Sequence, residues 1–297
     1  MPPAARDGEF DSTCRHRPGY PASLAHLGAA APHSLWLRGD HRLLERLDQE
    51  PAVTIVGSRR ATQYGREIAH ELGLLLAGAG VTVVSGLAFG IDAAAHRGAL
   101  DAGGSTIAVL GSGVDVAYPA GNRRLHARVG SEGLIVSEMP PGFGPFRWCF
   151  PARNRIMAAL GAVTIVVEAA ERSGSLITVR LAQGIGREVG VVPGPINSRF
   201  SRASNKLLAD GAFPVLGAES VLDELFGPGV RPLPERDDAL DPDHGSVLER
   251  VEAGDATPDA IARASGLAAE RVAAALAVLE LRGRIRADAA GRYVAAS

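Results

Sequence analysis

The stretch FRWCFPARNRIMAALGAVTIVVEAAERSGSLIT, residues 146–178, decides the fold of this chain. Its pattern predicts a loop, a helix over 153–160, a buried strand over 163–167, and a Ser/Gly loop that opens a second helix. A continuous apolar strand between two helices is typical of a parallel sheet that is covered on both faces.

The same stretch has an unusual charge pattern. Between Met139 and Val167 the chain contains no Asp or Glu. The first loop holds arginines and aromatic residues, and the second holds hydroxyl residues and a glycine. These residues are Arg147, Arg153, Arg155, Trp148, Phe150, Ser173, Gly174, Ser175 and Thr178. Guanidinium groups and aromatic faces beside a helix start predict a site for phosphate and bases.

Apolar runs alternate with helical periodicity on both sides of this stretch. The predicted strands are 52–56, 81–84, 105–110, 134–136, 163–167, 188–192 and 212–216. The predicted helices are 64–77, 91–100, 122–129, 153–160, 175–185, 205–209 and 219–226. This alternation predicts an α/β fold with an extended Rossmann-like, doubly wound and mostly parallel sheet.

Composition divides the chain into four parts. Residues 1–19 are polar and aperiodic, which predicts a disordered tail. Residues 20–226 hold the Rossmann-like domain, which begins with a short helix, an extended piece at 34–38 and a charged helix. Pro, Gly and charged residues over 227–244 predict a linker. Residues 245–297 predict three short helices and a hairpin, which is the layout of a winged-helix domain.

Charge and cysteine content limit the possible functions. The net charge is −2, so any affinity for nucleic acid has to come from a local patch. Lys206 is the only lysine; codon usage in a GC-rich genome explains this, but it leaves phosphate contacts mainly to arginine. Cys14 and Cys149 lack metal-site or disulfide spacing. No apolar segment resembles a signal peptide or approaches the roughly 20 residues that span a bilayer. We therefore expect a cytoplasmic protein without membrane contact.

The loops after the strands should form one surface, because the carboxyl ends of parallel strands meet at the same edge. Gly57 lets the backbone approach a phosphate, and Ser58 adds a hydroxyl. Arg59 and Arg60 supply charge. Residues 173–175 are expected to point free N–H groups outward at a helix start, where the dipole is worth about half a positive charge. We interpret the glycines of Gly111-Ser112-Gly113 as a tight turn. The sequence there lacks the third glycine that a dinucleotide-binding fingerprint requires.

Several catalytic motifs are absent. The chain has no GxxxxGK[ST], which excludes a P-loop ATPase, and no GxSxG or HExxH. We expect no catalytic residue, no metal and no other cofactor. Asp92 and His96 are four residues apart on a helix, a spacing that fits acid–base chemistry or packing. We favour packing, with Asp92 holding a loop N–H or an arginine, and we interpret Cys149 as a packed thiol.

Taken together, the motifs resemble the DprA/Smf family of DNA-processing proteins. The matching segments are VGSRRATQYG (56–65), SGLAFGIDAAAH (85–96), YP (118–119), SEMP (137–140), FPARNRI (150–156), VVEAAERSGSLIT (166–178), VPGPIN (192–197) and NKLLADGA (205–212). They cover residues 20–226, and a winged helix follows in many family members. Many members also begin with a small helical domain, whereas here a short polar tail precedes Tyr20.

The resemblance implies a domain that binds single-stranded DNA and forms a homodimer. It also implies that the protein protects incoming strands and helps to load RecA recombinase during natural transformation. Matching the motifs places at the site Gly57, Ser58, Arg59, Arg153, Asn154, Arg155, Ser173, Gly174, Ser175 and Thr178, with Lys206 at its margin. On this basis, replacing Arg59 or Arg153 by Ala should weaken DNA binding without lowering the melting temperature.

Two other functions remain open at this point. A Rossmann-like nucleotide hydrolase would need a carboxylate one turn into the helix after residues 173–175, but residues 172–187 contain no acid. A winged-helix transcription regulator would read bases with the helix at 269–281, which offers one Arg and no Asn or Gln. Residues 246–297 carry as many acids as arginines. We therefore favour a protein-contact or dimer-support role for this domain and expect single-strand binding to survive its removal.

Overall fold

The computed structural model describes residues 10–171, 173–234, 242–281, 284–288 and 291–295. The chain divides into two compact units, Met1–Pro234 and Glu235–Ser297.

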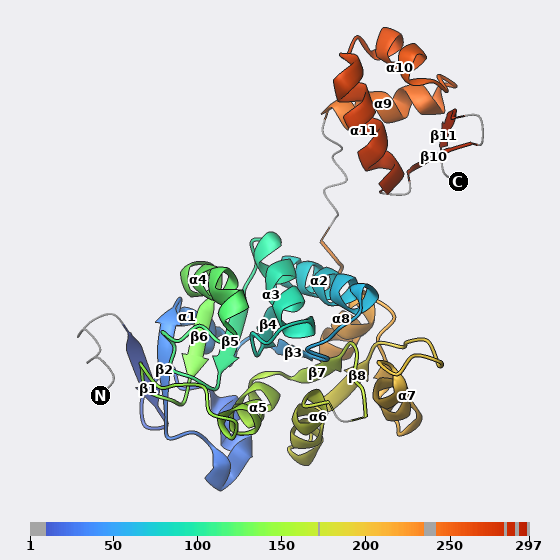
Figure 1. The fold of residues 1–297 in the computed structure, drawn as a ribbon. Coiled ribbons are helices and arrows are strands. Elements are labelled where there is room, and N and C mark those ends of the chain that lie inside the picture. Colours follow the sequence, from blue (N-terminus) through green and yellow to red (C-terminus); the bar gives the residue numbers. More distant parts are fainter. Residues whose placement is uncertain (1–9, 172, 235–241, 282–283, 289–290, 296–297) are drawn as a thin grey trace. The chain divides into compact units, whose positions relative to one another are not determined.

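A sheet of nine strands forms the centre of the first unit (Figure 1). The strands are β1 (Asp11–Cys14), β2 (Ser34–Gly39), β3 (Ala52–Val56), β4 (Thr82–Ser85), β5 (Thr106–Leu110), β6 (Leu134–Ser137), β7 (Val163–Val166), β8 (Glu188–Val191) and β9 (Phe213–Pro214). Their order across the sheet is β1-β2-β6-β5-β4-β3-β7-β8-β9. The seven strands from β6 to β9 pair in parallel, and β2 is antiparallel to both of its neighbours. The predicted mostly parallel α/β fold is confirmed.

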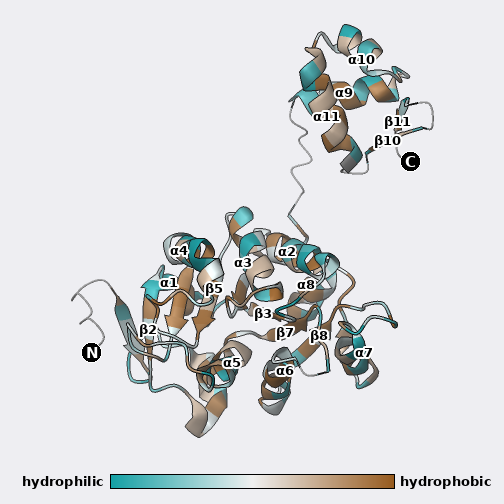
Figure 2. Cartoon of the chain, viewed as in Figure 1, coloured by the Kyte–Doolittle hydropathy of each residue, from teal (hydrophilic) through white to brown (hydrophobic). Residues whose placement is uncertain are grey.

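Helices cover both faces of this sheet (Figure 1). One face carries α2 (Gln63–Gly78), α3 (Ile91–Asp101), α4 (Arg123–Glu132) and α8 (Ala218–Phe226). The other carries η1 (Ala22–Ala30), α5 (Cys149–Leu160), α6 (Ser175–Gly184) and α7 (Arg202–Ala209). The two short elements α1 (Arg42–Arg46) and η2 (Ala120–Asn122) complete the unit. Apolar residues line the inner sides of these layers (Figure 2).

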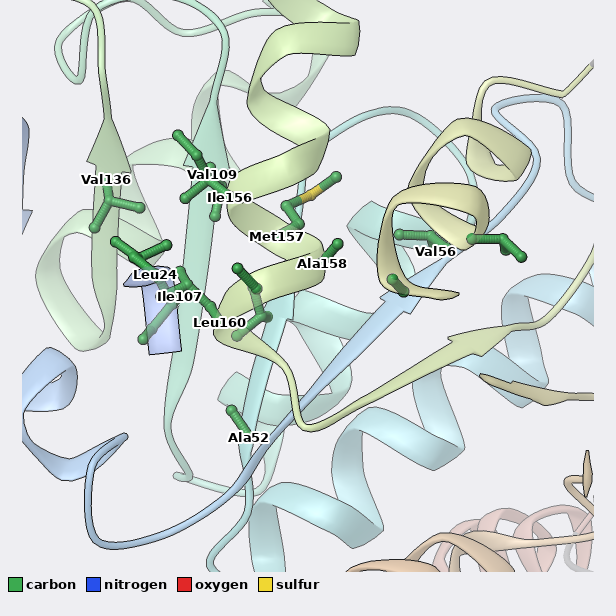
Figure 3. Close-up of a cluster of buried hydrophobic side chains, with 14 of the residues drawn as sticks. Leu24, Ala52, Val56, Ile107, Val109, Val136, Ile156, Met157, Ala158 and Leu160 are labelled. Carbon is green, nitrogen blue, oxygen red and sulfur yellow. The ribbon is translucent and has the colours of Figure 1, made fainter. Parts of the chain in front are cut away.

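The face that carries α5 shows why the central strands are apolar throughout. Ile156, Met157 and Leu160 of α5 belong to the same buried cluster as Ile107 and Val109 of β5, and all five side chains are at most 3% exposed (Figure 3). A strand that is buried on both faces cannot alternate apolar with polar side chains, so its sequence becomes a continuous β-branched run.

The order of the strands reverses beside β3. The chain runs from β3 outward to β6, and α5 then returns it to β7 on the other side of β3. Ser58 N–H, after β3, donates to the carbonyl of Glu168, after β7, at 2.8 Å. Ligands of open α/β sheets bind at such a reversal, outside the carboxyl ends of the strands.

The second unit has three helices and a hairpin around its own core. These elements are α9 (Pro242–Glu252), α10 (Pro258–Ser265), α11 (Ala269–Leu281), β10 (Ile285–Ala287) and β11 (Tyr293–Ala295). Thr257 caps α10 by accepting a hydrogen bond from Ala260 N–H. Val247, Ile261, Val272 and Leu276 fill the core. This arrangement confirms the winged-helix layout.

Three expected boundaries need correction. Part of the tail predicted as disordered is a strand, because the β1 backbone pairs with the otherwise free edge of β2; residues 1–9 lie outside the described residues. The predicted linker is shortened at both ends, since Arg231 stacks on Phe226 at 4.0 Å and α9 already begins at Pro242; residues 235–241 are not described. Helix α5 begins at Cys149, because Pro151 is tolerated in a first helical turn.

Among the described residues, no helix is both long enough and apolar enough to cross a bilayer.

Candidate nucleic-acid interface

A cavity of about 630 Å³ opens at the carboxyl ends of β3 and β7, where the strand order reverses. Its walls come from the loops after β3, β4 and β7, from the start of α5 and from the loop before α7. The predicted site residues that line it are Gly57, Ser58, Arg59, Arg60, Arg147, Arg153, Asn154, Ser173, Gly174, Ser175 and Thr178. Arg155 and Lys206 are not among its lining residues.

Three arginines form the rim of the cavity: Arg59, Arg60 and Arg147, all of which are exposed. Arg59 lies over the Phe150 ring, with its Cζ 5.4 Å from the ring centroid. Among the described residues no carboxylate is ion-paired with any of these three arginines; the ion pairs of this region involve Arg153 and Arg155 instead. The rim therefore carries free positive charge that is available to an anion.

Aromatic side chains continue from this rim. Phe150 and Tyr118 lie with their ring centroids 5.3 Å apart at an angle of 31°. A smaller cavity of about 90 Å³ lies beside these rings and shares Arg59, Phe150 and Arg153 with the larger one. Aromatic residues that line a cavity suit stacking with bases, which is tolerant of sequence.

The hydroxyl groups of the cavity differ in their availability. Ser173 Oγ and Ser175 Oγ bond to each other at 2.7 Å, and Ser58 Oγ accepts from Arg60 N–H at 3.2 Å. Thr178 is 1% exposed, and its Oγ1 has no partner among the described residues. A buried hydroxyl without a partner is costly. Thr178 Oγ1 is therefore an unsatisfied polar atom in the wall of the cavity.

The expectation of free N–H groups at the start of α6 is wrong in large part. Ser175 N–H points at Ser173 Oγ at 3.4 Å, and Leu176 and Ile177 N–H donate to Ser173 and Gly174 carbonyls at 3.2 and 3.1 Å. Short side chains and a tight turn satisfy these donors locally. The anion capacity of the cavity therefore rests mainly on the rim arginines.

Arg153 is also different from its expected role. It is only 7% exposed, and its guanidinium donates to the carbonyls of Gly86 and Val109. Asp92 Oδ2 lies 3.8 Å from Arg153 Nη2, and Asp92 also accepts from Ala88 N–H at 3.4 Å. A Cβ on Gly86 would collide with the guanidinium, so only glycine fits there. Arg153 thus forms the floor of the cavity and ties the loop after β4 to strand β5.

Burial shifts the pKa values of Arg153, Asp92 and the neighbouring His96. It lowers the pKa of Arg153 to about 10, while Asp92 opposes that shift. It raises the pKa of Asp92, against the attraction of Arg153. It lowers the pKa of His96 to about 3, and His96 Nδ1 lies 2.7 Å from Thr106 Oγ1. Asp92 and His96 are therefore packed residues, as the sequence suggested, and Cys149 is buried as well.

Arg155 lies outside the cavity, contrary to the prediction. Its guanidinium donates to both oxygens of Glu138 at 2.7 and 2.8 Å and to the carbonyl of Ala30 at 2.6 Å. Arg153 and Arg155 are two residues apart on α5, so their side chains point to different sides of the helix. The sequence interpretation treated both as unpaired loop arginines, and both are paired.

Glu168 has a role that the sequence did not indicate. Its carboxylate accepts from Thr62 N–H at 2.9 Å and from Thr62 Oγ1 at 2.5 Å. Its carbonyl accepts from Ser58 N–H. One buried residue therefore fixes both ends of the loop that presents Arg59 and Arg60.

Phe200 is a cavity residue that the sequence interpretation missed. Arg199 lies over its ring, 4.9 Å from the centroid. The signal was present, because this Arg–Phe pair belongs to an acid-free stretch that also contains Arg202 and Lys206. Lys206 itself is exposed on α7. Among the described residues, no group of His, Cys, Asp or Glu is arranged to hold a metal ion.

Comparison with known proteins gives consistent matches. The family model of DNA recombination-mediator protein A matches residues 11–226, and that of the DprA winged helix domain matches residues 231–291. A relative from Mycobacterium tuberculosis that carries the name DNA processing protein DprA is 42% identical over 260 residues, which is 85% of this chain and 66% of that protein. This chain therefore spans slightly less than two thirds of that relative.

Two solved structures share the fold. The X-ray structure of DNA processing protein A from Streptococcus pneumoniae is 40% identical, with a TM-score of 0.68 over 73% of this chain and 75% of that one. A structure of DNA processing protein A from Helicobacter pylori is 31% identical, with a TM-score of 0.65 over 73% of this chain and 95% of that one. Its description concerns a single-stranded DNA binding mode. By sequence, domain content and fold, the chain belongs to the DprA/Smf family of DNA-processing proteins.

Proposed function

We propose that the cavity binds single-stranded DNA with little preference for sequence. The observation that carries this proposal is the rim of Arg59, Arg60 and Arg147, which is exposed, has no carboxylate partner among the described residues and adjoins the aromatic pair Phe150 and Tyr118. Guanidinium groups bind the backbone, and aromatic rings stack on bases of any identity. The single-strand binding mode described for the Helicobacter pylori relative supports the same function.

Preference for single strands follows from the shape of the site. Bases can stack on Phe150 only if they are unpaired, because a duplex holds its bases in an internal stack. Fluorescence anisotropy with labelled single-stranded and blunt duplex DNA tests this. With three to five phosphates neutralised, log K should fall with log salt at a slope of roughly −2 to −3.5 for the single strand. Equal affinity for blunt duplex would contradict the proposal.

We also propose that this family member binds DNA rather than hydrolysing a nucleotide. Asp92 is the only carboxylate among the described residues that line the cavity, and Arg153 and Ala88 N–H already occupy it. A hydrolase would need a carboxylate that is free to contact the ribose or a water. Release of base or phosphate from nucleotides by the purified protein would argue for the hydrolase.

The winged-helix unit is a weaker candidate for reading DNA. Arg271, the one arginine of α11, is ion-paired with Asp243 at 2.5 and 2.6 Å. A base-reading arginine needs both of its donor groups free for guanine. This pairing favours a contact or dimer-support role for the unit over transcription regulation.

A role in the cell is suggested by the family model that matches the chain, which is described as DNA recombination-mediator protein A. We propose that the protein acts in the cytoplasm as a homodimer during natural transformation. There it shields incoming single strands from nucleases and helps RecA recombinase to load on them. Strand-exchange assays with and without this protein, at limiting RecA, test the loading step. Sedimentation velocity tests the dimer.

A further inference from the structure

Three aromatic side chains cluster in the segment between β6 and α5. Phe143 packs edge-on against Phe146, with ring centroids 5.3 Å apart, and against Trp148, with centroids 6.2 Å apart. Phe146 and Trp148 are 54% and 58% exposed. Large rings that stay this exposed next to each other usually mark a contact surface.

The segment that carries these rings is held rigidly. Gly142 N–H donates to both carboxylate oxygens of Asp115 at 2.8 and 2.9 Å, and Gly113 N–H donates to the Phe143 carbonyl at 2.9 Å. Phe146 is held through its own carbonyl, which accepts from Cys149 N–H at 3.1 Å. Preorganised rings lose little conformational entropy when they bind a partner.

The two exposed rings belong to residues that adjoin a cavity residue in the chain. Phe146 and Trp148 flank Arg147, whose side chain lines the cavity, so their Cα atoms are each about 3.8 Å from that of Arg147. The chain from Met139 to Val167 contains no acid. The nearby Asp115 carboxylate is occupied by Gly142 N–H.

We propose that Phe146 and Trp148 form a second stacking platform, on which bases rest just after the strand leaves the cavity. The proposal rests on the proposed function. The occupant is a DNA strand rather than a protein, because the platform adjoins the rim residue Arg147 in the chain and no acid occurs between Met139 and Val167. Arg147 contacts the backbone between the cavity and the platform. The site therefore binds more nucleotides than the cavity alone can hold.

Tryptophan fluorescence gives a direct test. The chain has two tryptophans, and Trp36 lies on β2. A Trp36→Phe variant leaves Trp148 as the only tryptophan. Titration with oligothymidylate of about 16 nucleotides should quench its emission, and an abasic backbone of the same length should not. Tight binding of the long oligonucleotide with unchanged Trp148 emission would overturn the proposal.

Affinity measurements distinguish this platform from the cavity. Trp148→Ala and Phe146→Ala should each weaken binding of the long oligonucleotide roughly 5- to 100-fold. They should leave binding of an oligonucleotide of about 4 nucleotides, and the salt slope, nearly unchanged. Trp36→Phe is the matched control and should bind like the wild type.

Two results separate the possible failures. If the short oligonucleotide binds and neither variant affects the long one, the platform is refuted and the proposed function stands. If the wild type binds neither oligonucleotide, both are refuted. A change in oligomeric state without a change in long-strand affinity would instead assign the platform to a second copy of the chain.

Discussion

The rim and the floor of the cavity contain the same kind of residue in opposite settings. Arg59, Arg60 and Arg147 at the rim are exposed and have no carboxylate partner among the described residues, whereas Arg153 at the floor is buried against two carbonyls and Asp92. A guanidinium with protein partners on several sides has few donors left for a ligand. The number of arginines around a cavity is therefore larger than the number that can bind phosphate. We therefore expect the rim to bind the strand and the floor to hold the loop after β4 against β5.

The largest effect is expected at the floor. Arg153→Met should destabilise the fold by about 3–5 kcal/mol, because it leaves Asp92 buried without its cation. Urea denaturation monitored by circular dichroism measures this loss. The double variant Arg153→Met/Asp92→Asn should recover part of it, because the uncompensated charge is then removed. A stable Arg153→Met protein that has lost only DNA binding would restore the original expectation of a phosphate ligand.

The rim should show the opposite behaviour. Arg59→Ala and Arg147→Ala should each weaken single-strand binding by about 1.5–3 kcal/mol, since each removes charged hydrogen bonds to the backbone. The salt slope should become shallower by about 0.7 per arginine removed, while the urea midpoint stays in place. Arg155→Gln is the matched control, because Arg155 lies outside the cavity and should leave the affinity unchanged. A rim variant with wild-type affinity would show that the strand follows another path.

Mild acid should lower the stability of the fold through a buried histidine next to the floor of the cavity. His96 is buried and its pKa falls to about 3, against an ordinary value near 6.5, because burial disfavours its charged form. As the pH falls below 6.5, His96 is protonated in the unfolded chain before it is protonated in the folded one. The free energy of unfolding therefore has its full value above pH 6.5 and falls below that pH. The expected slope is about 1.4 kcal/mol per pH unit between pH 6 and 5. Urea midpoints over this range measure it, and His96→Gln should show a shallower slope. An equal slope in the variant would assign the acid sensitivity to other groups.

The smallest effect is expected from the second unit, because residues 246–297 carry as many acids as arginines. A chain that ends at Pro234 should bind a single strand within about twofold of the full chain, because the cavity belongs entirely to the first unit. Anisotropy with the two proteins measures this ratio. Loss of affinity in the shortened chain would show that the winged-helix unit is part of the interface.

The fold could be predicted from the sequence because a strand that is buried on both faces is apolar at nearly every position. The runs at 52–56 and 163–167 are apolar throughout, and both are central strands. The strand β1 has no such pattern, because it has four residues and only Thr13 is buried. Its pairing with β2 became visible only in the structure.

The site was predicted less evenly. The loop after β3 lines the cavity, and its position could be predicted because it directly follows a strand with a clear apolar pattern. Arg153 and Arg155 were not distinguished, because their partners are distant in the sequence. Arg153 donates to carbonyls 67 and 44 residues away, and Arg155 to one 125 residues away. Such pairings depend on the packing of α5, which no local pattern reveals.

One measurement tests the central claim most directly. Anisotropy titrations compare a single strand with its blunt duplex, using the wild type and the double variant Arg59→Ala/Arg147→Ala, with urea midpoints recorded for both proteins. The account predicts that the wild type prefers the single strand, and that the double variant loses this binding with an unchanged midpoint. Equal binding of both DNA forms, or full single-strand affinity in the double variant, would contradict it.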